Sequence, residues 1–240
     1  MDQWVLTQAQ YMFLLRGLFV TLQVLGWSFL LGVGLSLVFG VARLSDREWV
    51  RGAALVYVEF ARGISSIILL FIMAIAIPIL LGIGQAPLIM LASIALGINM
   101  GGYGAEIVRG AINSIPKGQT EASIALNLSP TQRLRYVVLP QAMRVILPPM
   151  GNLTIEILKG TALVALVGMT DLMQQTRNLI QMQLAEGVGG VTVLFLNVLV
   201  IYFIAAQAVN GLFRLGERYV NSRFEQRRGR SAVRISEVAA

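Results

Sequence analysis

The stretch Gly118-Gln-Thr-Glu-Ala-Ser-Ile-Ala-Leu-Asn127, continued by Leu-Ser-Pro-Thr-Gln-Arg-Leu-Arg-Tyr-Val-Val-Leu-Pro140, is charged although long apolar runs lie on both sides of it. Its first half holds good helix formers, and Asn127 can end that helix. Ser129 is followed by Pro130 and then by Gln132, a capping-box pattern that starts a second helix. The stretch therefore predicts two short helices with a break between them. Such a loop is either a docking surface or a plain amphipathic connector.

Composition indicates a membrane protein. Of the 240 residues, 56% are hydrophobic and only 13% are charged, whereas soluble domains carry about 25% charged residues. The mean hydropathy is +0.73. The chain has no Cys and no His, which excludes disulfide scaffolds and thiol catalysis and removes the usual soft metal ligands.

Uncharged runs predict five transmembrane helices. The run at 17–42 is long enough to cross about 30 Å of hydrocarbon, and 187–213 forms the last span. The run at 63–105 fits two spans, the first beginning near Ala53, with a turn near 82–87. A further run at 145–170 is interrupted by charges. The predicted class is thus an all-α membrane protein.

Basic residues predict the orientation. The segments 43–51, 109–144 and 214–240 hold fifteen Lys or Arg, whereas the alternate segments 1–14, 82–87 and 171–186 hold only Arg177. Cytoplasmic loops are enriched in these residues. We expect a multi-pass membrane protein whose N-terminal segment lies outside, whose loop at 118–140 lies in the cytoplasm and whose C-terminal basic tail lies inside.

Two sequence segments resemble a known family. Glu121-Ala-Ser-Ile-Ala-Leu-Asn127, followed by Tyr136-Val-Val-Leu-Pro140, resembles the EAA loop of ABC importer permeases. The flanks 106–119 and 139–142 are similar to polar amino acid uptake permeases, and the resemblance covers 15–213. It implies a type I ABC importer permease architecture in the bacterial inner membrane, with an extracytoplasmic segment at 1–14, a five-helix permease domain at 15–213 and a cytoplasmic tail at 214–240. In that family the loop is a coupling helix that sits in a cleft of the ATPase.

The resemblance assigns ATPase coupling to the loop 117–140, with Gly118, Glu121, Ala122, Ser123 and Asn127 as its residues. Asn127 stands where the family usually has Gly, which predicts a left-handed backbone that Asn tolerates better than most residues. Ser123 replaces the second Ala of the motif.

Three acid–base pairs at i, i+3 spacing place opposite charges on one helix face. The pair Glu106–Arg109 lies at the cytoplasmic end of the third span and is interpreted as structural. Glu59 pairs with Arg62, which opens an Arg-Gly-Ile-Ser segment where the family usually shows Arg-Gly-Thr-Pro. Glu156 and Lys159 form the third pair.

The pair Glu156–Lys159 is placed near the middle of its apolar run, where each charge costs about 2.5–3.5 kcal/mol on insertion scales. Such groups are expected to face the protein interior or a cavity. One hypothesis is a substrate site, in which Glu156 binds an ammonium group and Lys159 or Arg62 binds a carboxylate, with Asn152 and Thr161 completing the polar lining. The alternative is a self-neutralising pair that only keeps the helix insertable.

The sequence contains no phosphate-binding G-x-x-x-x-G-K-[ST] motif, so we expect no enzymatic activity in this chain and no cofactor or metal. The resemblance implies half of a pathway for a polar amino acid or related small zwitterion, such as a compatible solute. Its implied partners are an ATPase dimer, a second permease in a homodimer or heterodimer, and an extracytoplasmic solute-binding protein. The alternatives are a secondary transporter or channel subunit, and a membrane-embedded enzyme, for which no constellation is evident.

Overall fold

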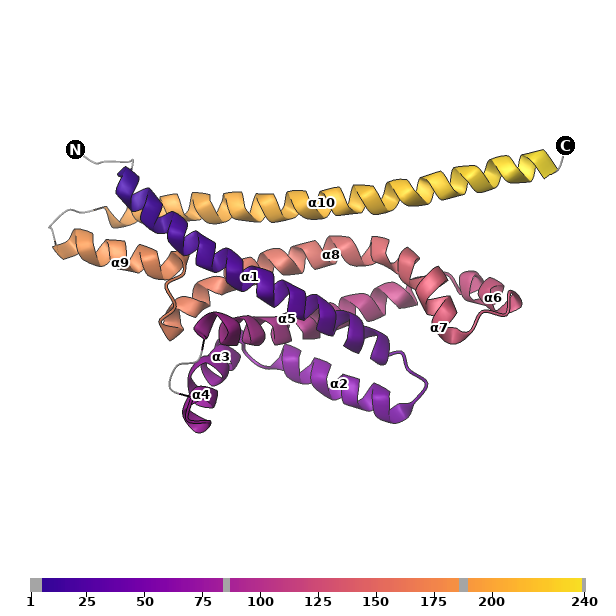
Figure 1. Ribbon diagram of the computed structural model, residues 1–240, viewed down its shortest axis with the longest axis horizontal. Helices are drawn as coiled ribbons and strands as arrows, with labels where there is room; N and C mark the ends of the chain where they lie inside the picture. Colours follow the sequence, from indigo (N-terminus) through magenta and orange to yellow (C-terminus); the bar gives the residue numbers. More distant parts are fainter. Residues whose placement is uncertain (1–5, 84–86, 186–189, 239–240) are drawn as a thin grey trace.

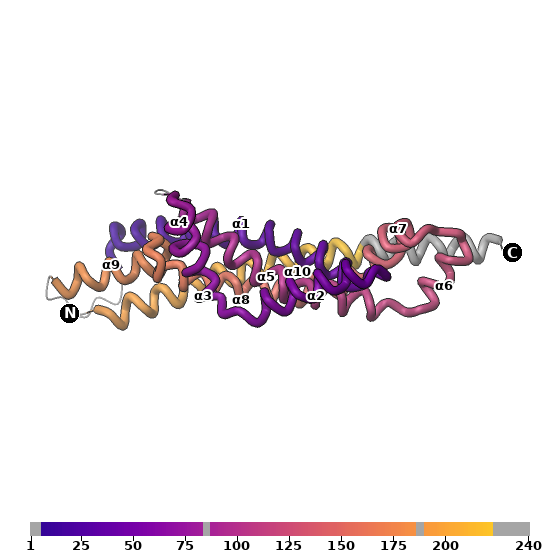
Figure 2. Tube along the Cα trace, turned by 90° about the horizontal axis from the view of Figure 1, so that it is seen from below, coloured from indigo at the N-terminus to yellow at the C-terminus, as the bar shows by residue number. Residues whose placement is uncertain are grey.

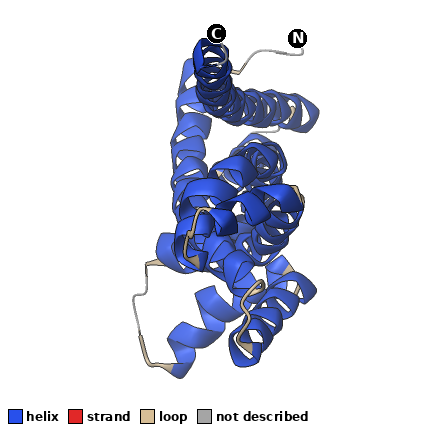
Figure 3. Cartoon of the chain, turned by 90° about the vertical axis from the view of Figure 1, so that its right-hand side faces the viewer, coloured by secondary structure: helices blue, strands red, loops and turns tan. Residues whose placement is uncertain are grey.

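The computed structural model describes residues 6–83, 87–185 and 190–238, and every regular element in these ranges is helical (Figure 3). The elements are α1 (Gln8–Ala42), α2 (Glu48–Gly63), α3 (Ser66–Phe71), the π-turn η1 (Ile72–Ala76), α4 (Ile77–Leu80), α5 (Leu88–Asn113), α6 (Lys117–Ala125), α7 (Pro130–Arg133), the π-turn η2 (Leu134–Val138), α8 (Leu139–Gly160), the 3₁₀ segment η3 (Thr161–Val167), α9 (Leu172–Ala185) and α10 (Val191–Val238). The long helices run along one axis, and α6 and α7 lie at the same end as the C-terminus (Figures 1 and 2).

Four helical runs are long and apolar enough to cross a membrane, namely α1, α5, the run Pro130–Val167 and the first part of α10. The pair formed by α2 and the segment Ser66–Leu80 also passes this test together, but it is bent by 99°. The five predicted spans therefore correspond to four helical runs and one broken span.

The break in the second span was not predicted. Ile64 and Ser65 have extended backbone, with ψ of 138° and 131°, so the helical conformation is interrupted at two consecutive residues. Asn99 of α5 is buried at this break; its Nδ2 donates to the carbonyl of Ala61 at 2.9 Å and its Oδ1 accepts from the Ser66 hydroxyl at 3.2 Å. Backbone groups freed inside a membrane protein need such partners.

The turn expected at 82–87 is described only in part. Gly82 has a φ of 65°, a left-handed conformation that glycine adopts readily. Residues 84–86 lie outside the described residues, and so do residues 186–189, where the last span was expected to begin.

Two helices begin earlier than the apolar runs suggest. The first starts at Gln8, within the segment assigned to the N-terminal tail, because Thr7 forms a capping box with Gln10. The helix then continues through Arg16. The run that contains α8 starts at Pro130 instead of Val145, because the π-turn η2 carries the chain into α8 despite Pro140, which has no N–H to donate.

Small residues let α5 approach its neighbours closely. A Cβ added at Gly97 would lie 2.9 Å from a methyl carbon of Leu31 on α1, and one at Gly101 would collide with the hydroxyl of Tyr57 on α2. A Cβ at Gly104 would likewise collide with the Ser36 hydroxyl. The Gly97–Gly101 pattern therefore serves helix packing within the subunit.

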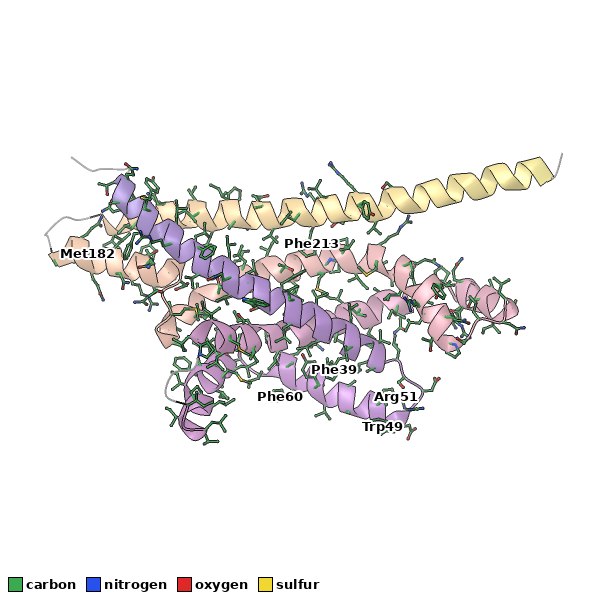
Figure 4. All side chains as sticks on the ribbon, viewed as in Figure 1. Phe39, Trp49, Arg51, Phe60, Met182 and Phe213 are labelled. Carbon is green, nitrogen blue, oxygen red and sulfur yellow. The ribbon has the colours of Figure 1, made fainter. Side chains whose placement is uncertain are left out.

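Helix α10 closes the bundle over α1 and α8. Phe213 packs edge-on against Phe29 of α1, with 5.9 Å between ring centroids, and lies between α10 and α8 (Figure 4). Gly151 of α8 makes room for this ring, since a Cβ there would lie 3.0 Å from the Cγ atom of Phe213. This packing fixes which face of α8 is buried and which is left uncovered.

Candidate functional site

The hairpin formed by α6 and α7 is built by local hydrogen bonds. Helix α6 ends in a Schellman motif, in which the N–H of Asn127 donates to Ile124 and the N–H of Leu128 donates to Ser123. Asn127 has a φ of 59°, which confirms the predicted left-handed turn. The Ser129–Gln132 capping box also forms, with both of its hydrogen bonds present.

The hairpin exposes apolar side chains at the end of the molecule that carries the C-terminus. Ile124 is 52% exposed and Leu126 is 74% exposed, beside the exposed carboxylate of Glu121. Gly118 and Ala122 are also exposed, whereas Ser123 is buried and donates to the carbonyl of Thr120 at 2.6 Å. Exposed apolar groups on a short polar segment are typical of a docking surface.

We expect Asn127→Gly to be well tolerated. Glycine reaches this left-handed conformation at no steric cost, so the melting temperature should stay the same or rise slightly. Asn127→Val is the contrasting variant, because a left-handed backbone costs an ordinary residue about 1–2 kcal/mol. Thermal unfolding of the purified protein in detergent checks both. A glycine variant that melts as low as the valine variant would contradict the role of this turn.

Helix α8 has one uncovered stripe along its length. Its members are exposed and recur at helical spacing: Val145, Pro148, Asn152, Glu156 and Lys159. The stripe is apolar at its first two positions and polar at the last three. The structure thus brings Asn152, Glu156 and Lys159 onto one face.

The charged pair on this stripe differs from the expectation. The salt bridges formed by the described residues do not include Glu156 or Lys159, and both side chains are exposed in the single chain instead of facing its interior. Lys159 lies in the last turn of α8, where a cation interacts favourably with the helix dipole. The pair is therefore near the end of α8, which tightens into η3 at Thr161.

Thr161 and Arg62 are placed away from this stripe. Thr161 is fully buried and its hydroxyl donates to the carbonyl of Leu158 at 2.6 Å. Arg62, at the end of α2, forms an ion pair with Glu59 at 3.8 Å and lies 5.6 Å from the ring centroid of Tyr103 on α5. The described contacts of Arg62 thus join α2 to α5 and place a second charged patch on the single chain.

The expected structural pair at the end of α5 is present and has a third member. Glu106 accepts from Arg109 at 2.8 Å and 3.0 Å, and it also lies 3.2 Å from Arg43 at the end of α1. The carboxylate is therefore shared between two guanidinium groups. This arrangement fastens α1 to α5 and agrees with a structural role.

Two polar residues of structural importance were missed. Asn99 contacts the break in the second span. In the sequence it is a polar amide within the uncharged run 63–105, and this isolated polar residue could have indicated a buried hydrogen-bonding role. Asp171 is fully buried before α9, where its carboxylate accepts from the backbone of Gln174 at 3.0 Å and Met173 at 3.2 Å. Burial raises the pKa of the Asp171 carboxyl above its ordinary value, although these two hydrogen bonds oppose the shift.

Comparison with known proteins decides the family. The model of the family described as the inner membrane component of binding-protein-dependent transport systems matches residues 32–214. The chain belongs to this family. It is a membrane-spanning permease of an ABC importer and a transport subunit instead of an enzyme.

Individual relatives agree with this assignment. The permease is 38% identical over 212 residues to a probable amino-acid ABC transporter permease of Sinorhizobium fredii, covering 85% of this chain and 86% of the relative. It is 36% identical over 149 residues to the glutamine transport system permease of Escherichia coli, covering 62% of this chain and 68% of the relative.

The fold also matches a solved transporter. A chain in the crystal structure of an amino acid ABC transporter with histidines superposes with a TM-score of 0.74 at 28% identity, covering 86% of the permease and 94% of that chain. The permease therefore has the type I ABC importer fold predicted from its sequence.

Proposed function

We propose that this permease forms half of a pathway for a polar amino acid or a related small zwitterion. A second permease subunit completes the pathway, an ATPase docked on the hairpin drives it, and a solute-binding protein delivers the ligand outside. The relatives named for amino acid and glutamine transport support this substrate class. In this proposal the domains are the permease at 15–213, flanked by an outer segment and a cytoplasmic tail.

The observation that carries the proposal is the uncovered charge on membrane-spanning helices. Glu156 and Lys159 on α8 are exposed in the single chain, and so are Glu59 and Arg62 at the end of α2. A charge facing lipid at depth costs several kcal/mol, so such groups face protein or a water-filled cavity. A second subunit laid against these faces would remove them from lipid and enclose a polar path.

The hairpin supports coupling to a separate ATPase. Glu121 with Ile124 and Leu126 forms an exposed mixed surface that a membrane span does not need. A channel or a secondary transporter would work without ATP and would leave this surface without a purpose. In the proposed assembly Glu121 contacts a polar group in the ATPase cleft, while the two apolar residues are buried there.

Affinity purification tests the assembly. A tagged permease, expressed with its chromosomal neighbours and extracted in mild detergent, should recover an ATPase and a second permease chain. Recovery of the permease alone, under conditions that preserve its native melting temperature, would contradict the proposed assembly.

The orientation is tested by thiol labelling. The chain has no native Cys, so single replacements report cleanly. Asp2→Cys and Asn178→Cys should react with an impermeant reagent in intact cells, whereas Thr120→Cys and Gln226→Cys should react only after lysis. Arg16 lies about two turns after the start of α1, toward the outer side. It is a single residue, so the cytoplasmic segments still hold far more Lys and Arg than the outer ones. Labelling of position 120 from outside would rule out ATPase docking on the hairpin.

A further inference from the structure

The side chain of Gln141 joins three segments at the base of the hairpin. Its Nε2 donates to the Oε1 atom of Gln119 on α6 at 3.0 Å, and it also donates to the carbonyl of Val137 in the π-turn η2 at 3.0 Å. Gln141 itself belongs to the first turn of α8. We infer that Gln141 is a positioning residue that transmits movement of the coupling helix α6 to α8, and this inference rests on the proposed function.

The bond to Val137 lies at a weak point of the helical run. Pro140 cannot donate a backbone hydrogen bond, and the ladder before it is widened into the π-turn η2. Single π-turns inside helices are frequent at functional sites. By supplying a side-chain donor here, Gln141 stiffens the junction through which α7 continues into α8.

The bond to Gln119 provides a second connection. Without it, α6 would act on α8 through its packing against η2 and through the chain that runs by Asn127 and the short helix α7. The Gln119–Gln141 pair spans these intervening residues directly, so a displacement of α6 acts on the first turn of α8. The same helix carries Asn152, Glu156 and Lys159 further along its exposed face. The hydrogen bonds of Gln141 therefore link the proposed ATPase contact to the proposed pathway.

Gln141 is the donor and Gln119 the acceptor of the bond between them, so variants that remove or exchange these roles test the inference. Gln119→Glu keeps an acceptor of the same length and should remain coupled, whereas Gln119→Lys and Gln119→Leu remove the acceptor. Gln141→Glu cannot donate and should also uncouple. The pair Gln119→Lys with Gln141→Glu restores a donor and an acceptor between these two positions with exchanged roles but not the bond to Val137, so it should recover more coupling than Gln141→Glu alone. An effect of packing or folding alone would not follow this order.

The measurement is stimulated ATP hydrolysis by the full complex in proteoliposomes. The probe is the cognate binding protein saturated with whichever of glutamine, arginine or cystine stimulates the wild type most. Each uncoupled variant should lose about three- to tenfold in stimulation, the range expected for one hydrogen bond. Co-purification of the ATPase should be unchanged. Gln207→Leu, an exposed glutamine on α10, is the matched control and should behave as the wild type.

The outcomes separate this inference from the proposed function. Stimulation lost in Gln119→Lys, kept in Gln119→Glu and higher in the exchanged pair than in Gln141→Glu alone would support it. Equal stimulation in all variants, additive losses in the exchanged pair, or loss of the bound ATPase would overturn it while leaving the proposed function in place. A wild-type complex without ATP-dependent transport would overturn both.

Discussion

Glu121→Lys is expected to lower ATP-driven uptake by about tenfold or more, because a charged hydrogen bond in a docked interface contributes about 1.5–3 kcal/mol. Glu121 is exposed on α6 beside Ile124 and Leu126, so its replacement leaves the fold of the single chain unchanged. The ammonium of the introduced Lys would carry a positive charge to the ATPase group that otherwise contacts the Glu121 carboxylate, and the ATPase would therefore dock weakly.

Two measurements on the same membranes check this result, namely the amount of ATPase recovered with the permease and the rate of uptake. Thr131→Lys on α7 is a control with a new positive charge on the same hairpin, since Thr131 is also exposed. Unchanged recovery and uptake in Glu121→Lys would refute the docking role. Equal losses in both variants would mean that the hairpin responds to charge in general.

Glu156→Gln is expected to change the ranking of transported solutes. The variant keeps the size of the side chain and removes its charge, so affinity for a cationic group should fall by about 1.5–3 kcal/mol. The melting temperature should stay close to that of the wild type, because Glu156 is exposed and the salt bridges of the described residues do not join it to Lys159.

The structural alternative predicts the opposite pattern. If Glu156 served only to neutralise Lys159, its loss would lower the melting temperature and leave the ranking of solutes unaltered. Thermal unfolding and uptake of acidic, neutral and basic amino acids in one reconstituted series distinguish the two. Asn152→Leu, one turn away on the same stripe, should reduce uptake of polar solutes generally without reordering them by charge.

The hairpin was predictable because its determinants are local. A left-handed Asn127 and the Ser129–Gln132 capping box lie within a few residues of each other, and both formed as expected. The apolar runs likewise located most of the spans. Their ends were less predictable, since the Thr7 capping box and the π-turn before Pro140 extend helices beyond the uncharged runs.

The break in the second span depends on tertiary contacts. It is bridged by Asn99, which contacts Ala61 and Ser66 from another helix, and no local pattern in 61–66 specifies that partner. The shared carboxylate of Glu106 is similar, because Arg43 reaches it from α1. Sequence spacing identifies pairs of charges on one helix, but it does not identify a third charged residue that comes from another helix.

Helical periodicity separates Thr161 from the other α8 residues of the candidate pathway. At 100° per residue, Asn152, Glu156 and Lys159 fall on one face, whereas Thr161 falls about 180° from Asn152. The structure agrees, with Thr161 fully buried. The exposure of Glu156 and Lys159 in the single chain could not be predicted from periodicity. It depends on whether another helix of the same chain packs over this face of α8, which is a tertiary contact.

The most direct test is uptake into proteoliposomes that contain the permease, its second subunit and its ATPase, with the loaded binding protein on the opposite side of the membrane from ATP. Uptake of a labelled polar amino acid should require hydrolysable ATP and the binding protein together, and it should be insensitive to an imposed proton or sodium gradient. Uptake driven by an ion gradient without ATP would contradict an ATP-driven importer and favour a secondary transporter.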